Sequence, residues 1–136
     1  MREYLFRAKL IKNGEWAYGN LRVMPDNTYI ITPNETVVGE YGKVNSETVG
    51  QYIGLTDKNG RKIFEGDIVH ILGNEYVEEW KNIDYYATIV FIDGGYCAID
   101  GTIEDYGLIR YNLSRMDFDV EVVGNIYDNP ELLEKE

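Results

Sequence analysis

Histidine and cysteine occur once each in this sequence of 136 residues, as His70 and Cys97. Catalysis by a Ser-His-Asp or Cys-His arrangement would depend on His70 alone, and this residue lies within an apolar stretch that is typical of a strand. Cys97 lacks a partner for an intramolecular disulfide, so a small buried thiol is the simpler interpretation. The sequence also has no cluster of metal ligands and no glycine-rich loop that opens a helix. We therefore predict no catalytic residue, no metal, no cofactor and no enzymatic activity.

Long apolar runs are absent as well. No segment approaches the roughly 20 consecutive apolar residues that a membrane-spanning helix needs. The first ten residues include Arg2, Glu3, Arg7 and Lys9, where a secretion signal would have an apolar core. We therefore expect a cytoplasmic protein with no membrane partner.

Basic residues are scarce, with 13 Lys and Arg against 24 Asp and Glu, for a net charge of −11. The excess is confined to the second half, because residues 1–68 hold nine acids and nine bases whereas residues 69–136 hold fifteen acids and four bases. Duplex DNA is bound chiefly by neutralising its phosphates with Lys and Arg. The sequence therefore predicts no direct, non-specific binding of nucleic acid.

Strand and turn signals are what the sequence has in abundance. Within residues 48–72, the turn DKNG at residues 57–60 separates two apolar stretches and predicts a hairpin, because Asp, Asn and Gly suit its backbone. A second tight turn at residues 64–67 leads into the apolar strand 68–72. Such a sharp bend before a paired strand is common in small barrels.

Near the N-terminus, apolar residues alternate with other residues over residues 4–10 and predict a half-buried strand. Asn13 and Gly14 then predict a hairpin that returns through residues 16–23. A short third strand is expected at residues 29–32.

In the second half, residues 85–93 and 96–100 predict a central strand pair joined at Gly94 and Gly95. Asn129, followed by proline and acids, predicts a short C-terminal helix. Residues 73–86 leave two alternatives open, an amphipathic helix or a projecting hairpin or lid.

Four separated blocks carry a family resemblance: FRAK at residues 6–9, GEWAYG at 14–19, TVGQYIGLTDKNGRKIFEGDIV at 48–69 and VVGNIYDNPELL at 122–133. In this order they resemble the YopX family, small proteins encoded by bacteriophages and prophages. The resemblance covers almost the whole chain. It implies a mainly β fold with a barrel-like part, a phage or prophage origin and a function that is uncharacterised for the family, and it supplies no site residue.

Pattern and resemblance together predict a mainly β fold. We expect one domain over residues 1–136, a small barrel-like antiparallel β domain of the SH3-like or YopX-like kind. Its expected parts are an N-terminal β-hairpin region at 1–43, a barrel-like part at 44–128, and a short helix with a tail at 129–136.

Aromatic residues are numerous, with twelve Tyr, four Phe and two Trp. This exceeds what one compact core encloses easily, and Tyr and Trp suit a half-wet interface. The candidate interaction surface comprises these seven residues: Trp16, Tyr18, Tyr52, Phe64, Trp80, Tyr85 and Tyr86.

Residues 116–122 alternate apolar residues with Asp117, Asp119 and Glu121. This pattern places three carboxylates on one face of a strand. Such a face can attract a divalent cation, but a solvated or charged edge that discourages strand addition is the simpler interpretation.

The leading hypothesis is an uncharacterised phage or prophage accessory protein in the bacterial host cytoplasm. We expect it to act as a non-catalytic binding or self-assembling module, with a protein partner or a homo-oligomer as its complex. One alternative is an acidic DNA mimic that inhibits a host nucleic-acid-binding enzyme. Another is a carboxylate-dependent hydrolase, which would need a pocket with paired acids.

Overall fold

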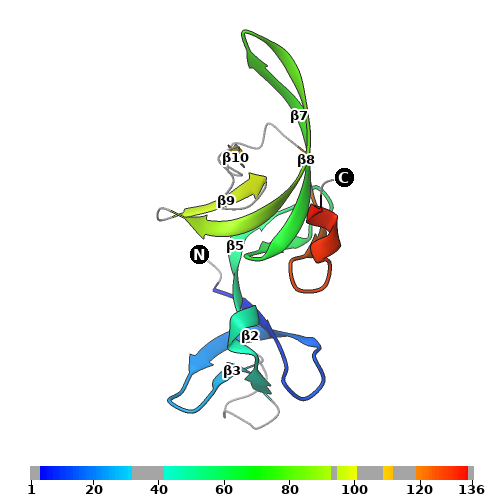
Figure 1. Cartoon of the computed structure of the whole chain (residues 1–136). Coiled ribbons are helices and arrows are strands. Elements are labelled where there is room, and N and C mark those ends of the chain that lie inside the picture. Colours follow the sequence, from blue (N-terminus) through cyan, green and yellow to red (C-terminus); the bar gives the residue numbers. More distant parts are fainter. Residues whose placement is uncertain (1–3, 32–41, 93–94, 101–108, 112–118, 135–136) are drawn as a thin grey trace. The chain divides into compact units, whose positions relative to one another are not determined.

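The computed structural model describes residues 4–31, 42–92, 95–100, 109–111 and 119–134 (Figure 1). The chain divides into two compact units, Met1–Gly54 and Leu55–Glu136. In the described residues the strands form two antiparallel sheets and no closed barrel. The mainly β, antiparallel prediction is confirmed, and the barrel-like part is corrected to open sheets. The interpretation as a single domain with boundaries at 43 and 128 stays a prediction.

The first unit is built from short strands. These are β1 Phe6–Lys9, β2 Trp16–Val23, β3 Thr28–Ile31, β4 Lys43–Val44 and β5 Gly50–Thr56, with the 3-10 turn η2 Ser46–Thr48 before β5. Strand β5 runs on into the second unit, where β6 spans Lys62–Phe64. The strand order of this sheet is β4-β3-β2-β1-β5-β6.

The predicted hairpin between β1 and β2 is confirmed. Gly14 has a φ of 73°, which glycine adopts readily, and its N–H donates to the Leu10 carbonyl at 2.8 Å. The Asn13 side chain accepts a hydrogen bond from the Glu15 N–H at 2.9 Å. This turn fixes the register, in which Lys9 lies opposite Trp16.

An isolated bridge curls the first sheet without closing it. Leu10 pairs with Val44, and the Ile11 N–H donates to the Lys43 carbonyl at 3.0 Å. The apolar side chains inside the curl form one core: Ala8, Ile30 and Val44 are buried, and Phe6, Leu10, Ala17, Leu21 and Val49 pack against them. In the described residues, β4 has two residues and forms an isolated bridge with Leu10.

The second unit contains the larger sheet. Its strands are β7 Asp67–Val77, β8 Glu79–Ile92, β9 Gly95–Asp100, β10 Ile109–Tyr111 and β11 Asp119–Asn125, in the order β10-β9-β8-β7-β11. The predicted pairing of β8 with β9 is confirmed, and β8 lies at the centre of the sheet. The join predicted at Gly94 falls outside the described residues. Fully buried side chains fill the core: Ile68, Val69, Ile71, Ala87, Ile89 and Ala98.

The predicted C-terminal helix is only a 3-10 turn, η4 Pro130–Leu133. Asn129 makes no side-chain cap for it. Its Oδ1 instead accepts a hydrogen bond from the Asn125 N–H at 3.2 Å, which ties the chain back to the end of β11. Within the described residues, no helix is long and apolar enough to span a bilayer.

Residues 73–86 form a hairpin, so the helical alternative is wrong. The ladder between β7 and β8 continues to the pair Val77 and Glu79, and Glu78 turns the chain with a φ of 68°. Within the described residues, strand β11 pairs with β7 as far as Leu72, and β9 pairs with β8 from Thr88 onward. The segment 73–86 continues the β7–β8 ladder as a two-stranded ribbon, which we call the hairpin arm (Figure 1).

The predicted turn between β5 and β6 is confirmed, and Asp57 holds it together. This residue is 6% exposed. Its Oδ1 accepts hydrogen bonds from the Asn59 and Arg61 N–H groups, both at 2.9 Å, and its Oδ2 accepts one from the Val122 N–H at 2.9 Å. Burial acts to raise the pKa of Asp57, but the three backbone donors and the Arg61 charge outweigh it and lower the pKa.

Candidate functional site

One face of the first sheet gathers cations and aromatic rings. Directly paired residues share a face and alternate residues along a strand return to it, so the register places eight such side chains together. We call this set the basic face: Arg7, Lys9, Trp16, Tyr18, Arg22, Tyr29, Lys43 and Tyr52. The core described above lies on the opposite face of the same strands.

The centre of the basic face is a cation–π arrangement. The Arg7 guanidinium carbon lies 4.6 Å from the centroid of the Trp16 ring, and the Lys9 ammonium lies 5.5 Å from it. Arg7 is only 6% exposed, Trp16 and Lys9 are half-buried, and Tyr18 beside them is 45% exposed. Rings and cations at these distances attract each other, so the cations are held in position before any partner arrives.

The acids that the structure describes in the first unit lie outside its strands. The first unit holds six acids and six bases and is therefore neutral as a whole. In the part of this unit that the structure describes, the acids are Glu15, Asp26 and Glu47, and none lies on a strand. Among the described residues, the strands of this unit therefore carry bases and no acid.

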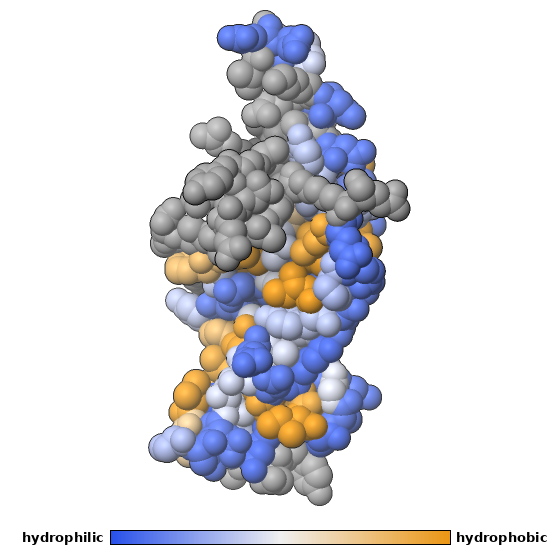
Figure 2. Space-filling view, viewed as in Figure 1, coloured by the Kyte–Doolittle hydropathy of each residue, from blue (hydrophilic) through white to orange (hydrophobic). Residues whose placement is uncertain are grey.

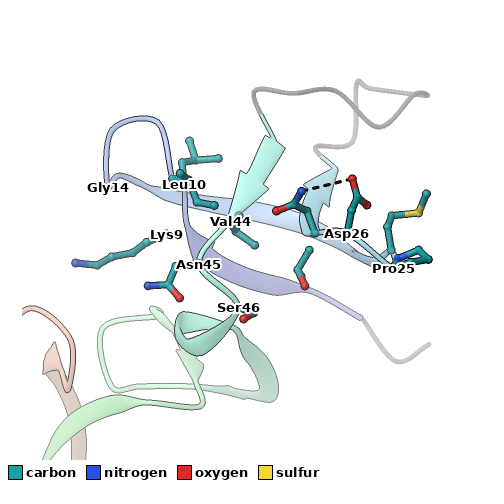
Figure 3. Close-up of a pocket in the computed structure, with 12 residues that line it drawn as sticks. Lys9, Leu10, Gly14, Pro25, Asp26, Val44, Asn45 and Ser46 are labelled. Atoms are coloured by element: carbon teal, nitrogen blue, oxygen red, sulfur yellow. Dashed lines mark hydrogen bonds between the residues drawn. The ribbon is translucent and has the colours of Figure 1, made fainter.

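A hollow of about 670 Å³ lies on the same unit, beside the bridge between Leu10 and Val44 (Figure 3). Its walls include Ile11, Met24 and Pro25. Figure 3 shows the Lys9 side chain extending away from the other side chains that line the hollow. The hollow therefore offers apolar and neutral polar groups and one carboxylate, Asp26, whereas the charge of Lys9 belongs to the basic face.

A second polar group lies on the larger sheet. His70 Nε2 is 2.6 Å from Asp84 Oδ1, and the His70 ring stacks on Tyr86 with centroids 4.8 Å apart. Glu121 lies opposite His70 and forms an ion pair with Lys58 at 3.1 Å. The carboxylate and the ring both fix the orientation of the imidazole.

Cys97 is too far from His70 to act with it. Cys97 pairs with Val90, whereas His70 pairs with Tyr86. The two side chains are thus separated by two strand spacings and by four residues along β8, which is roughly 13 Å along the strand alone. Among the residues with described side chains, no three His, Cys, Asp or Glu gather as a group that could hold a metal ion.

Comparison with known protein families shows to which family the chain belongs. A family model described as "YopX protein" matches residues 5–134. The chain belongs to the YopX family. No curated protein matches it. Among solved structures, this YopX-family chain is similar to the crystal structure of protein EF1440 from Enterococcus faecalis, with a TM-score of 0.52 and 23% identity over 98% of this chain and 100% of that chain. That likeness shows a shared fold.

The seven aromatic residues predicted as an interaction surface fall in three places in this YopX-family chain. Trp16, Tyr18 and Tyr52 share the basic face. Phe64 is 3% exposed and belongs to the core. The others lie on β8: Trp80 on the hairpin arm is 72% exposed, Tyr85 is half-buried opposite Ile71, and Tyr86 is 44% exposed against His70.

The predicted acidic face is described only in part. Asp117 lies outside the described residues of this YopX-family chain. Asp119 is exposed and lies opposite Leu72, and Glu121 is half-buried in its ion pair with Lys58.

Sequence reasoning missed the cations of the basic face. Arg7 and Lys9 were visible as the polar half of an alternating strand, and the Asn13 and Gly14 turn sets the register that brings them against Trp16. The signal was therefore present in the strand pattern and the turn of this YopX-family chain, but only when the two were combined.

Proposed function

We propose that this YopX-family protein is a non-catalytic binding module, an accessory protein of phage or prophage that works in the host cytoplasm. Its basic face takes a protein partner that presents carboxylates and aromatic side chains. The observation that carries the proposal is the pair of cations, Arg7 and Lys9, held against Trp16 on strands that carry no acid among the residues the structure describes.

The composition of this face supports a protein partner. Trp, Tyr and Arg are the residues in which the binding energy of protein interfaces concentrates. Cations already ordered by a neighbouring ring lose little side-chain entropy on binding, so more of the interaction energy contributes to the binding free energy. In Figure 2 the apolar residues of the visible side form separate clusters bordered by hydrophilic ones.

The charge of the whole chain argues against nucleic acid as that partner. The second unit carries the entire net charge of −11. An extended polyanion would be repelled by this unit, whereas a short acidic segment of a protein can contact the basic face without contacting the second unit.

The test compares tagged wild-type protein with the variant Tyr18→Ala/Arg22→Glu, both recovered from cells in which the phage genes are expressed. Tyr18 and Arg22 are exposed members of the basic face, so the variant is expected to fold. We expect a stoichiometric protein partner, which can be a second copy, on the wild type and not on the variant. Lys12→Glu, an exposed base off the strands, is the matched control and keeps the partner. A partner retained equally by both proteins, or no partner on the wild type, would refute the proposal.

An acidic decoy is the second candidate function, supported by the confinement of the excess charge to the second unit. Some of its carboxylates already have internal partners, since Asp57 accepts three backbone hydrogen bonds, Asp84 contacts His70 and Glu121 contacts Lys58. If the decoy is correct, the partner is a host nucleic-acid-binding enzyme, and added duplex DNA displaces it. The hydrolase alternative gains no support from the hollow, where Asp26 is the one acid among the lining residues.

A further inference from the structure

We infer that the partner of the basic face is the hairpin arm of a second copy of this chain. The inference rests on the proposed function and names its partner. It combines two features that lie on different units, a basic aromatic face on the first and an acidic aromatic ribbon on the second.

The hairpin arm has the chemistry that the basic face would recognise. Residues 73–86 hold four acids, Glu75, Glu78, Glu79 and Asp84, and one base. Glu78 and Glu79 are exposed at the turn of the arm. Trp80 follows them directly and is 72% exposed, which matches Val23 as the most exposed large apolar side chain described.

The arm also presents a large apolar side chain that a contact would cover. In the described residues, its two strands pair with each other as far as Val77 and Glu79, and Trp80 lies one residue from this end. Docking would cover one side of the ribbon and remove the Trp80 ring from water.

Charge complementarity selects the basic face as that surface. Arg22 and Tyr18 are exposed there, Lys9 and Lys43 are half-buried, and no acid described in this unit lies on its strands. Opposite charges on two surfaces guide their encounter and fix their register, and like charges in the same places oppose it. Because the face and the arm are different surfaces, the contact is heterologous. Two copies could form it reciprocally, or many copies could form it in succession as a linear chain.

The experiment reverses the charge of each surface separately. The face variant is Arg22→Glu/Lys43→Glu, and the arm variant is Glu78→Lys/Glu79→Lys. Native mass is measured over a concentration series for each variant and for an equimolar mixture of the two. Lys12→Glu and Glu131→Lys/Glu134→Lys reverse exposed charges elsewhere and serve as matched controls.

We expect the wild type and both controls to self-associate, and each variant alone to associate at least about tenfold more weakly. The mixture is expected to regain association. In a mixed pair, the acidic face of one variant meets the basic arm of the other, and the remaining face and arm keep their wild-type charges. This recovery requires that the face of one copy contacts the arm of another, so a loss of folding cannot imitate it.

Two results would overturn the inference. One is a wild type that stays monomeric throughout the series, and the other is a mixture that associates no better than the separate variants. In either case a different stoichiometric partner, lost from Tyr18→Ala/Arg22→Glu, would leave the proposed function standing. If no partner of any kind is lost from that variant, both fail.

Discussion

At the scale of single residues, Asp57 offers the sharpest test of the fold. Its two carboxylate oxygens accept three backbone hydrogen bonds, one of which crosses from the β5–β6 turn to Val122 in β11. Asp57→Asn replaces one acceptor oxygen with a donor that faces a backbone N–H. We expect a loss of about 1 to 3 kcal/mol in the free energy of unfolding at neutral pH, measured by urea denaturation. The exposed Asp119→Asn is the control and is expected to change little.

The same carboxylate links stability to pH. The pKa of Asp57 is lowered from its ordinary value of 3.8, so its contribution is fully present above that value and is lost as pH falls through the folded-state pKa. The difference in unfolding free energy between wild type and Asp57→Asn should therefore shrink in acid. A difference that stays constant down to the lowest pH at which both proteins remain folded would show that the carboxylate charge is not responsible.

Individual residues also show how far the sequence could lead toward the site. Composition was enough to single out Trp16 and Tyr18, but the same reasoning included Phe64, which the fold buries. Aromatic side chains suit cores and interfaces equally, so exposure depends on the packing of distant segments. Arg7 and Lys9 needed the hairpin register, which is a property of two strands together.

At the scale of elements, turns were predictable and the hairpin arm was not. The Asn-Gly and Asp-Lys-Asn-Gly turns depend on local backbone preferences, and both occur as expected. In the arm, apolar residues recur at helical spacing, yet the ladder that begins in the buried part of β7 and β8 continues outward to Val77 and Glu79. Tertiary pairing thus overrides the local pattern, as it does for the C-terminal turn, where Asn129 bonds Asn125 instead of capping a helix.

The β5–β6 turn also gives a prediction at this scale. Gly60 has a φ of +80°, and an added Cβ would meet no atom within 4 Å. Gly60→Ala should therefore destabilise the protein by about 1 to 2 kcal/mol through backbone strain alone. Gly95 at the start of β9 has equal space without the left-handed φ, so Gly95→Ala is the matched control and should be nearly neutral in thermal or urea unfolding. Equal losses in the two variants would contradict a role for backbone conformation.

At the scale of the whole molecule, charge is divided between a neutral unit and one that carries −11. If the basic face binds the hairpin arm, association should weaken as salt rises, because the Debye length falls from about 10 Å at 0.1 M to about 3 Å at 1 M. Sedimentation of the wild type at about 0.1 M and about 1 M salt measures this change in association. Association that strengthens with salt would point to an apolar contact instead.

The two tryptophans allow the single-domain prediction to be tested, because Trp16 lies in the first unit and Trp80 in the second. Strand β5 begins in the first unit and ends in the second. Loss of its strand pairing in one unit should therefore destabilise its pairing in the other. We therefore expect the units to unfold together. Trp80→Phe leaves Trp16 to report on the first unit, and Trp16→Phe leaves Trp80 to report on the second.

Adding Asp57→Asn to each reporter makes the test decisive, because Asp57 lies in the second unit. If the units are coupled, Trp16 fluorescence should show the same loss of unfolding free energy as a backbone probe such as circular dichroism. If Asp57→Asn lowers only the transition seen by Trp80, the units unfold independently and the protein has two domains. Because Trp16→Phe weakens the basic face, each reporter variant is compared with its own parent rather than with the other.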